Sequence, residues 1–309
     1  MSKRQPRWSP LSLPAVRNQY VQDVDAFRSA CERDGRAAEF LDVLRNEALV
    51  ASVADLYWVS QPMAQLALDA SHDLPEWSIG AVIPGRNGLI VWDGDLPTLE
   101  WRDAPDDLGV RSPLGVRQMP QVPVVAAIWS ATVTSVVVRP LTHVRHTMPL
   151  IADLPRGPRD VDTFRGLAGI GVKTPPLPLD QPFGRDDYAG PAGGLIAALG
   201  ATWLLMSQPT VSDLRRERVG KGALHDPPDR SGADVSIVDL RRLAVDRTSE
   251  TPADGDRIYR HRWLVRGHWR QQAYGPGRSQ RKPLWIESHI KGPAGAPLLA
   301  SERVMVWRR

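Results

Sequence analysis

The sequence is poor in cysteine, with Cys31 alone among 309 residues. One cysteine excludes an internal disulfide, and Cys31 falls in a helical apolar pattern, so we expect it to pack in the core. The N-terminal stretch MSKRQPRWSPLSLP carries basic residues but no apolar segment behind them, which argues against a secretory signal. These observations together predict a cytoplasmic protein.

Long hydrophobic runs and familiar catalytic motifs are also lacking. The longest stretch without charge, QVPVVAAIWSATVTSVVV, is interrupted by Pro123 and is better explained by buried strands than by a membrane span. HVRH supplies His143 and His146, but without an HExxH motif or a dense carboxylate set, so we predict no metal site and no cofactor. GLAGIGVKT departs from a phosphate loop, and a GxSxG elbow is absent.

Acidic residues are scarce at the C-terminal end. Residues 257–309 hold twelve Lys or Arg against two acids, Glu287 and Glu302, and therefore carry +10. Of the chain's 39 basic and 35 acidic residues, this leaves 27 and 33 in residues 1–256, or −6. The modest formal net charge of +4 conceals this division. A polyanionic partner is the natural expectation for the basic segment.

The periodicities predict an α+β protein of two domains. Helical apolar spacing recurs over residues 21–48 and again around Met63–Ala70, and short β-branched runs follow. GGLIAALGATWLLMSQP predicts a buried helix of about fourteen residues ending before Pro209, and TVSDLRRERVGKG a short exposed helix. We expect an α+β N-terminal domain over residues 1–230, made of a helical cluster and mixed strands. A small, mostly antiparallel β domain, rich in Trp, Arg and His, is predicted over residues 231–309.

The run HRWLVRGHWRQQ contains the clearest functional pattern. If residues 259–270 form a strand, alternate side chains face opposite sides. One side then carries Leu264, His268 and the arginines, while the other carries Trp263, Val265 and Trp269. A row of cations about 7 Å apart is comparable to the spacing of phosphates along a nucleic-acid strand.

Our leading hypothesis is a nucleic-acid-binding protein, for DNA or RNA, in which a basic strand and the loop after it hold phosphates. Nearby tryptophans could stack bases, although strand parity places Trp263 and Trp269 in the core. Protection of an edge strand, or solubility of a sheet, would explain alternating arginines equally well. The predicted phosphate ligands are Arg260, Arg262, Arg266, Arg270, Arg278, Arg281 and Lys282.

Two alternatives remain open. The first is a metal-independent, toxin-like ribonuclease in which His268 and His289 transfer protons and Arg266 stabilises the transition state. It requires the two histidines to meet, which depends on a strand register that the sequence does not reveal. The second is a protein-interaction module that meets an acidic partner, such as the chain's own N-terminal region.

Four segments of the C-terminal third carry a resemblance: TWLLMSQPTVSD, VSIVDLRR, YRHRWLVRGHWRQQ and LWIESHIKGPAGAPLL. They resemble blocks of a group of hypothetical proteins encoded in actinobacterial genomes, often in phage or plasmid regions. LYWVSQPMAQLALDASHDLPEW extends the resemblance into the N-terminal part. The resemblance implies a cytoplasmic, mobile-element setting, and it brings no catalytic residue, cofactor or activity with it.

Overall fold

The structure is a computed structural model. It describes residues 8–94, 96, 98–100, 121–151, 164–170, 174–184, 187, 192–219, 233–241, 260–293 and 295–298. The chain divides into two compact units, residues 1–240 and 241–309. We call the first the sheet domain and the second the ribbon domain. Both contain strands, and the α-helices of the described residues lie in the sheet domain, so the predicted α+β class is confirmed.

Helices of the sheet domain bury the apolar stripes that the sequence predicts. In α1 (Leu13–Arg33) the buried residues include Val24, Phe27 and the single cysteine, Cys31. Buried alanines and a methionine form the inner side of α3 (Gln61–Ser71). The predicted buried helix is α6 (Gly193–Met206), in which thirteen of fourteen residues are buried. The remaining helices are α2 (Ala38–Ser52) and α4 (Val144–Ile151), with the short 3-10 turns η1 (Pro10–Ser12) and η2 (Ile79–Ala81).

An eight-stranded mixed sheet forms the centre of this domain, in the order β11-β12-β1-β3-β6-β7-β8 with β9 beside β7. β1 (Asp55–Val59) runs parallel to both β12 (Ala233–Leu240) and β3 (Asn87–Trp92). The other pairings are antiparallel and involve β6 (Ala126–Ala131), β7 (Ser135–His143), β8 (Leu167–Gly169), β9 (Leu177–Pro178) and β11 (Ser212–Val219). Two short pairs lie outside it, β2 (Trp77–Ser78) with β10 (Pro182–Phe183), and β4 (Thr98–Glu100) with β5 (Gln121–Pro123).

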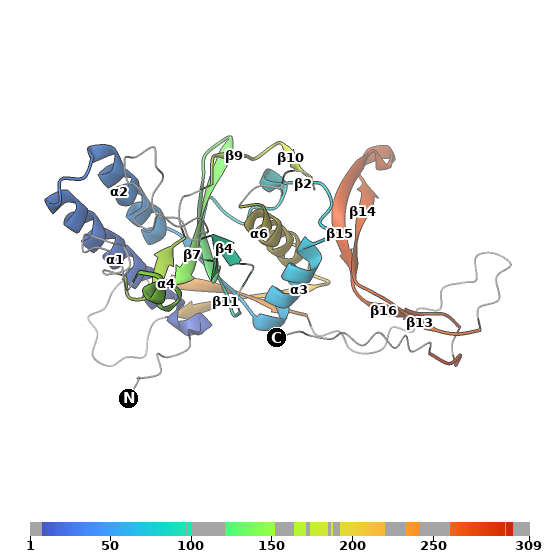
Figure 1. Ribbon diagram of the computed structural model, residues 1–309. Coiled ribbons are helices and arrows are strands. Elements are labelled where there is room, and N and C mark those ends of the chain that lie inside the picture. The colour runs from blue at the N-terminus through green and yellow to red at the C-terminus, as the bar shows by residue number, and fades with distance from the viewer. Residues whose placement is uncertain are drawn as a thin grey trace, which may run out of the picture. The chain divides into compact units, whose positions relative to one another are not determined.

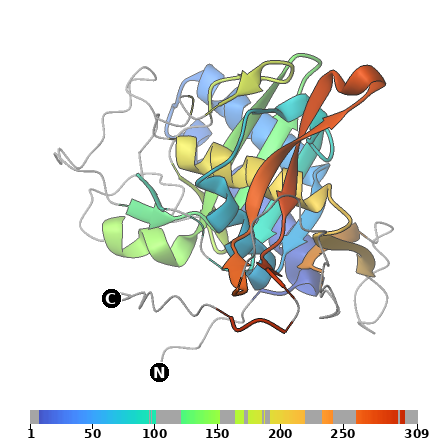
Figure 2. The ribbon, with the colours of Figure 1, turned by 90° about the vertical axis from the view of Figure 1, so that its right-hand side faces the viewer.

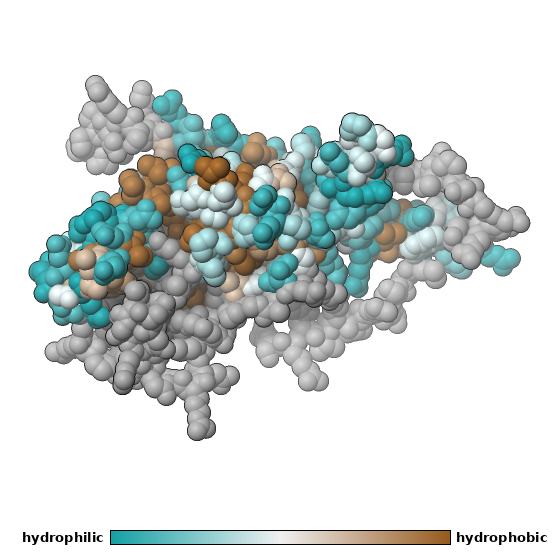
Figure 3. All heavy atoms as spheres, turned by 90° about the horizontal axis from the view of Figure 1, so that it is seen from above, coloured by the Kyte–Doolittle hydropathy of each residue, from teal (hydrophilic) through white to brown (hydrophobic). Residues whose placement is uncertain are grey.

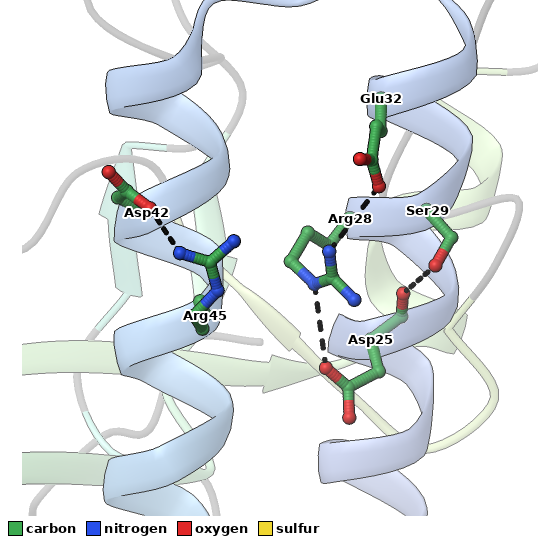
Figure 4. Close-up of polar contacts among 6 residues, drawn as sticks. All are labelled: Asp25, Arg28, Ser29, Glu32, Asp42 and Arg45. Atoms are coloured by element: carbon green, nitrogen blue, oxygen red, sulfur yellow. Dashed lines mark hydrogen bonds and ion pairs between the residues drawn. The ribbon is translucent and has the colours of Figure 1, made fainter.

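Helices cover both faces of the sheet. Figures 1 and 2 show α1 and α2 side by side on one face and α3 and α6 on the other. The outer end of the α1–α2 pair is largely hydrophilic (Figure 3). There Arg28 lies 3.7 Å from Asp25 and 3.5 Å from Glu32, and Arg45 lies 2.5 Å from Asp42 (Figure 4). A helix layer on each side explains why the central strands are almost continuously apolar.

The domain boundary lies at 240/241 rather than near residue 230. The segment VSIVDLRR was expected in the C-terminal domain, but its strand β12 pairs with β1 and β11 within the sheet domain. Val235 and Val238 of this strand are fully buried. The stretch GKGALHDPPDRSG, whose Gly, Pro and charge content predicts a linker between domains, therefore precedes an inner strand of the large sheet.

The segment TVSDLRRERV was expected to form a short exposed helix and instead forms strand β11. All eight of its residues pair with β12, from Ser212 opposite Leu240 to Val219 opposite Ala233. The sequence lacks the alternation of apolar and polar residues that usually indicates a strand. Most of β11 is exposed on both faces, so neither face needs to be apolar. The segment RVMVWRR, for which the sequence predicts a further C-terminal strand, lies outside the described residues.

A buried polar cluster ties α1, α2 and β7 together. The Glu47 carboxylate, 2% exposed, lies 3.0 Å from Nε of Arg139 and accepts a hydrogen bond from the hydroxyl of Tyr20. The Arg139 guanidinium also lies against the backbone of Gly169, where a Cβ would meet it at 2.2 Å. Burial makes this a charge pair whose members depend on each other.

Candidate nucleic-acid interface

The ribbon domain contains one long β-hairpin, visible as the pair of neighbouring strands β14 and β15 continuing into β13 and β16 (Figure 1). β13 (Trp263–Val265) pairs with β16 (His289–Lys291), and β14 (His268–Tyr274) pairs with β15 (Gln280–Ile286). Val265 faces His289 and His268 faces Ile286, so both strands advance by three residues across the break in the ladder. The two pairs therefore share one register, and we call residues 263–291 the basic ribbon.

The alternation predicted for residues 259–270 is confirmed from residue 263 onward, but not at His261, which is exposed, or at Arg262, which is half-buried. From residue 263 to residue 270 the side chains alternate between half-buried and exposed. The half-buried set is Trp263, Val265, Gly267 and Trp269, and the exposed set is Leu264, Arg266, His268 and Arg270. Opposite residues have numbers of the same parity, so the ribbon has an even-numbered side, which we call the cationic face, and an odd-numbered side, the tryptophan face.

On the tryptophan face, aromatic side chains pack against one another and against the backbone. Trp269 and Trp285 lie opposite each other with ring centroids 5.2 Å apart in an edge-to-face arrangement. The Trp285 indole is 9% exposed, and a Cβ at position 267 would lie 2.5 Å from its Cζ2. Gly267 is thus required because the indole occupies the space of a side chain.

The cationic face carries Arg266, Arg270 and Lys282 without any carboxylate, since the one acid of the ribbon, Glu287, has odd parity. The amide of Gln272 donates to the carbonyl of Ala273, and its side-chain oxygen accepts a hydrogen bond from the Arg270 guanidinium. Lys282 lies over the ring of Tyr274, with Nζ 5.5 Å from the ring centroid. These contacts orient Arg270 and Lys282 without neutralising them.

Exposed apolar side chains share this face. Leu264 is 60% exposed and lies opposite Ile290, which is 45% exposed, and Tyr274 near the turn is 41% exposed. Alternation predicts Leu264 on this face, whereas Ile290, Tyr274 and Gln272 were not predicted there. Their parity with Arg266 and Arg270 is the signal that would have identified them. The face therefore combines cationic, amide and apolar groups.

The other predicted phosphate ligands lie elsewhere. Arg260 is exposed just before the ribbon, Arg278 lies in the turn, and Arg281 is on the tryptophan face. Arg262 is half-buried, and its Nε donates to the carbonyl of Ala296 at 2.8 Å. Arg262 also forms an isolated β-bridge with Leu298. These two contacts give Arg262 a structural role, in which it binds the segment that follows the ribbon. The structure thus brings Arg266, Arg270 and Lys282 together.

The two histidines of the ribonuclease hypothesis are not brought together. His268 lies on the cationic face opposite Ile286, whereas His289 lies on the tryptophan face opposite Val265. Nδ1 of each ring is 3.0 Å from the carbonyl two residues earlier, that of Arg266 or Glu287. A carbonyl only accepts, so Nδ1 donates in each case. His268 shares its face with Arg266. Because His289 lies on the other face, the two histidines do not form the acid–base pair that the ribonuclease hypothesis requires.

The histidines of HVRH are occupied by hydrogen bonds within the sheet domain. Nδ1 of His143 accepts from the backbone N–H of Arg145 at 3.1 Å, and the ring stacks on Trp8 with centroids 4.9 Å apart. His146 lies 3.1 Å from both the Thr142 hydroxyl and Nε of Arg145. Burial, then the charge of Arg145, lowers the pKa of His143 to about 4. The described residues contain no group of three or more His, Cys, Asp or Glu placed to hold a metal ion.

No protein-family model matches the sequence, and no curated protein matches it significantly. Within the part of the chain that the structure describes, no helix is long and apolar enough to cross a membrane. Function is therefore inferred from the geometry of the basic ribbon.

Proposed function

We propose that this protein binds nucleic acid through the cationic face of the basic ribbon. The observation that carries the proposal is the segregation of the ribbon's side chains. The tryptophans take the less exposed face together with Arg281, Lys291 and Glu287. Arg266, Arg270 and Lys282 share the opposite face, which has no carboxylate among the ribbon's residues 263–291. Phosphates supply a regularly spaced negative charge that such a face can bind at several points at once.

Fluorescence anisotropy with labelled duplex DNA and labelled single-stranded RNA, over a series of salt concentrations, tests the proposal. The variant is Arg266→Ala, Arg270→Ala and Lys282→Ala in one chain, with Arg262 kept because of its hydrogen bond to Ala296. We expect affinity to fall steeply with salt for the wild type. The slope of log K against log salt should become shallower by about one for each phosphate that the variant no longer binds.

A matched control removes the same charge from the sheet domain by Arg33→Ala, Arg45→Ala and Arg218→Ala, all at exposed positions. Because the net charge of the two variants is equal, a difference between them measures the place of the charge rather than its amount. We expect the control to keep most of the affinity. An equal fall in affinity in both variants, or no binding by the wild type at low salt, would refute the proposal.

A further inference from the structure

The dimensions of the basic ribbon correspond to one groove of one nucleic acid. Two paired strands lie about 4.8 Å apart, and the major groove of B-DNA is about 12 Å wide and admits a two-stranded ribbon. The seven residue pairs of β14 and β15 span roughly 23 Å, less than the ~34 Å of one turn of DNA. The major groove of duplex RNA is deep and narrow and excludes such an element.

The position of the tryptophans argues against a single strand as the ligand. Proteins that bind single strands place aromatic rings beside their cations, so that bases stack on them. In the basic ribbon, Trp269 and Trp285 contact each other edge to face on the side opposite Arg266 and Arg270. On the cationic face the exposed aromatic side chain is Tyr274, and Lys282 covers its ring.

The middle of the cationic face carries an arginine oriented by its neighbour. The Gln272 amide donates a hydrogen bond to the Ala273 carbonyl, and the Gln272 side-chain oxygen accepts one from a terminal nitrogen of Arg270. A guanidinium has five N–H donors in a planar fork, so Nε and the other terminal nitrogen retain donors for a ligand. Paired donors of this kind match O6 and N7 of guanine, the commonest specific contact in the major groove.

We propose that the cationic face enters the major groove of duplex DNA and that Arg270 contacts the edge of a guanine. The proposal rests on the nucleic-acid binding proposed above and adds the class of ligand, the groove and one base contact. Arg266 and Lys282 neutralise phosphates. Leu264 and Ile290, exposed together on the same face, meet apolar groups such as the methyl of thymine.

The first experiment measures the affinity of the full chain for three probes of one sequence: duplex DNA, duplex RNA and single-stranded DNA. Exclusion from the RNA groove and the lack of stacking lead us to expect binding to duplex DNA about tenfold tighter, or more, than to the other two. Equal affinities, or a preference for RNA or a single strand, would overturn this inference and leave nucleic-acid binding standing. Absence of binding to all three would overturn both.

The second experiment identifies the groove. Duplex DNA containing glucosylated 5-hydroxymethylcytosine has its major groove filled by the sugar, while netropsin occupies the minor groove at A·T tracts. We expect the glucosylated duplex to bind about tenfold more weakly and netropsin to leave affinity unchanged. The reverse result would place the ribbon in the minor groove and refute the proposal.

The third experiment tests Arg270 with a matched pair of substitutions that keep the charge, Arg270→Lys on the cationic face and Arg281→Lys on the tryptophan face. Lysine can neutralise a phosphate but lacks the planar fork. Arg270→Lys should weaken binding to guanine-containing duplexes about tenfold and leave binding to duplexes of A·T pairs alone nearly unchanged. Arg281→Lys, at an exposed position outside the cationic face, should alter neither by more than about twofold. An equal response of the two variants would contradict the assigned guanine contact.

Discussion

Strand β11 and the basic ribbon are both exposed and rich in arginine, yet their charges are arranged in opposite ways. Arg215 of β11 forms an ion pair with Asp239 on the neighbouring strand and lies 3.9 Å from both Asp213 and Glu217. These carboxylates raise the pKa of its guanidinium above the ordinary value. On the basic ribbon, Arg266 and Arg270 share a face to which residues 263–291 contribute no carboxylate.

This difference separates two uses of a charged strand. Charged side chains on an edge strand discourage pairing with another chain. Where neighbouring acids neutralise the arginines, the strand also attracts polyanions less. β11 follows that pattern at the edge of the large sheet. The cationic face does not, so edge protection, which the sequence left open for HRWLVRGHWRQQ, explains β11 better than the ribbon.

The largest expected difference is in the free energy of unfolding lost when a buried or an exposed charged side chain is removed. Glu47→Ala removes the partner of Arg139 inside the sheet domain, and we expect it to lower the free energy of unfolding by about 3–5 kcal/mol. Arg266→Ala, on the exposed ribbon, should cost less than about 0.5 kcal/mol. Urea unfolding followed by circular dichroism measures both, and similar values for the two would contradict the description of the Glu47 cluster.

His143 should make the sheet domain sensitive to acid. Its pKa is lowered from 6.5 to about 4 in the folded protein, so below pH 6.5 the unfolded chain binds a proton that the folded chain resists. Stability should therefore fall as pH drops from about 6.5 to about 4, and this contribution should be constant above pH 6.5. The variant His143→Gln should lack that part of the slope. An identical pH profile in wild type and variant would count against a neutral, buried imidazole.

Packing of the tryptophan face should depend on Gly267. A methyl group there meets the Trp285 ring, so we expect Gly267→Ala to displace the indole at a cost of about 1–3 kcal/mol. The near-ultraviolet circular dichroism of the Trp269–Trp285 pair should weaken. Ser288→Ala, at an exposed position in the same break of the ladder, is the control and should change little. An unaltered spectrum in Gly267→Ala would show that the close approach is absent.

The smallest expected effect is a gain of DNA binding by β11 when the acids around its arginine are removed. Asp213→Asn, Glu217→Gln and Asp239→Asn together remove the acids around Arg215. If local neutralisation keeps β11 from binding polyanions, affinity for duplex DNA should rise by about two- to threefold at low salt. Unchanged affinity would mean that paired acids are not what distinguishes the two strands.

Sequence patterns predicted the features of the fold that depend on residues close together in the chain. The α6 helix follows from an uninterrupted apolar run before Pro209, and the two faces of the ribbon follow from alternation. Pairing between distant segments was not predictable. β12 looked like part of the C-terminal domain because its partner β1 lies near residue 57, and nothing in the local sequence connects the two.

The candidate site, like the fold, was predictable where it depends on alternation within one strand and not where it depends on pairing with a distant segment. Alternation indicated that Arg266 and Arg270 share an exposed face, and Lys282 joined them when the register was known. Arg262 looked equivalent by parity, but its hydrogen bond to Ala296 arises from a return of the chain some thirty residues later. The separation of His268 from His289 depends on a register that the amino-acid pattern does not encode.

The inner position of β12 also has a consequence for biosynthesis. Leu56 of β1 pairs with Val235, so about 180 residues must leave the ribosome before that edge of β1 is covered. At about 5–20 residues per second, the unpaired backbone edge of β1 waits roughly ten seconds or longer for its neighbour. The hairpin of the ribbon, whose strands are joined by a short turn, closes within microseconds of its own synthesis. The nascent chain therefore completes its largest sheet only shortly before it produces the surface proposed to bind DNA.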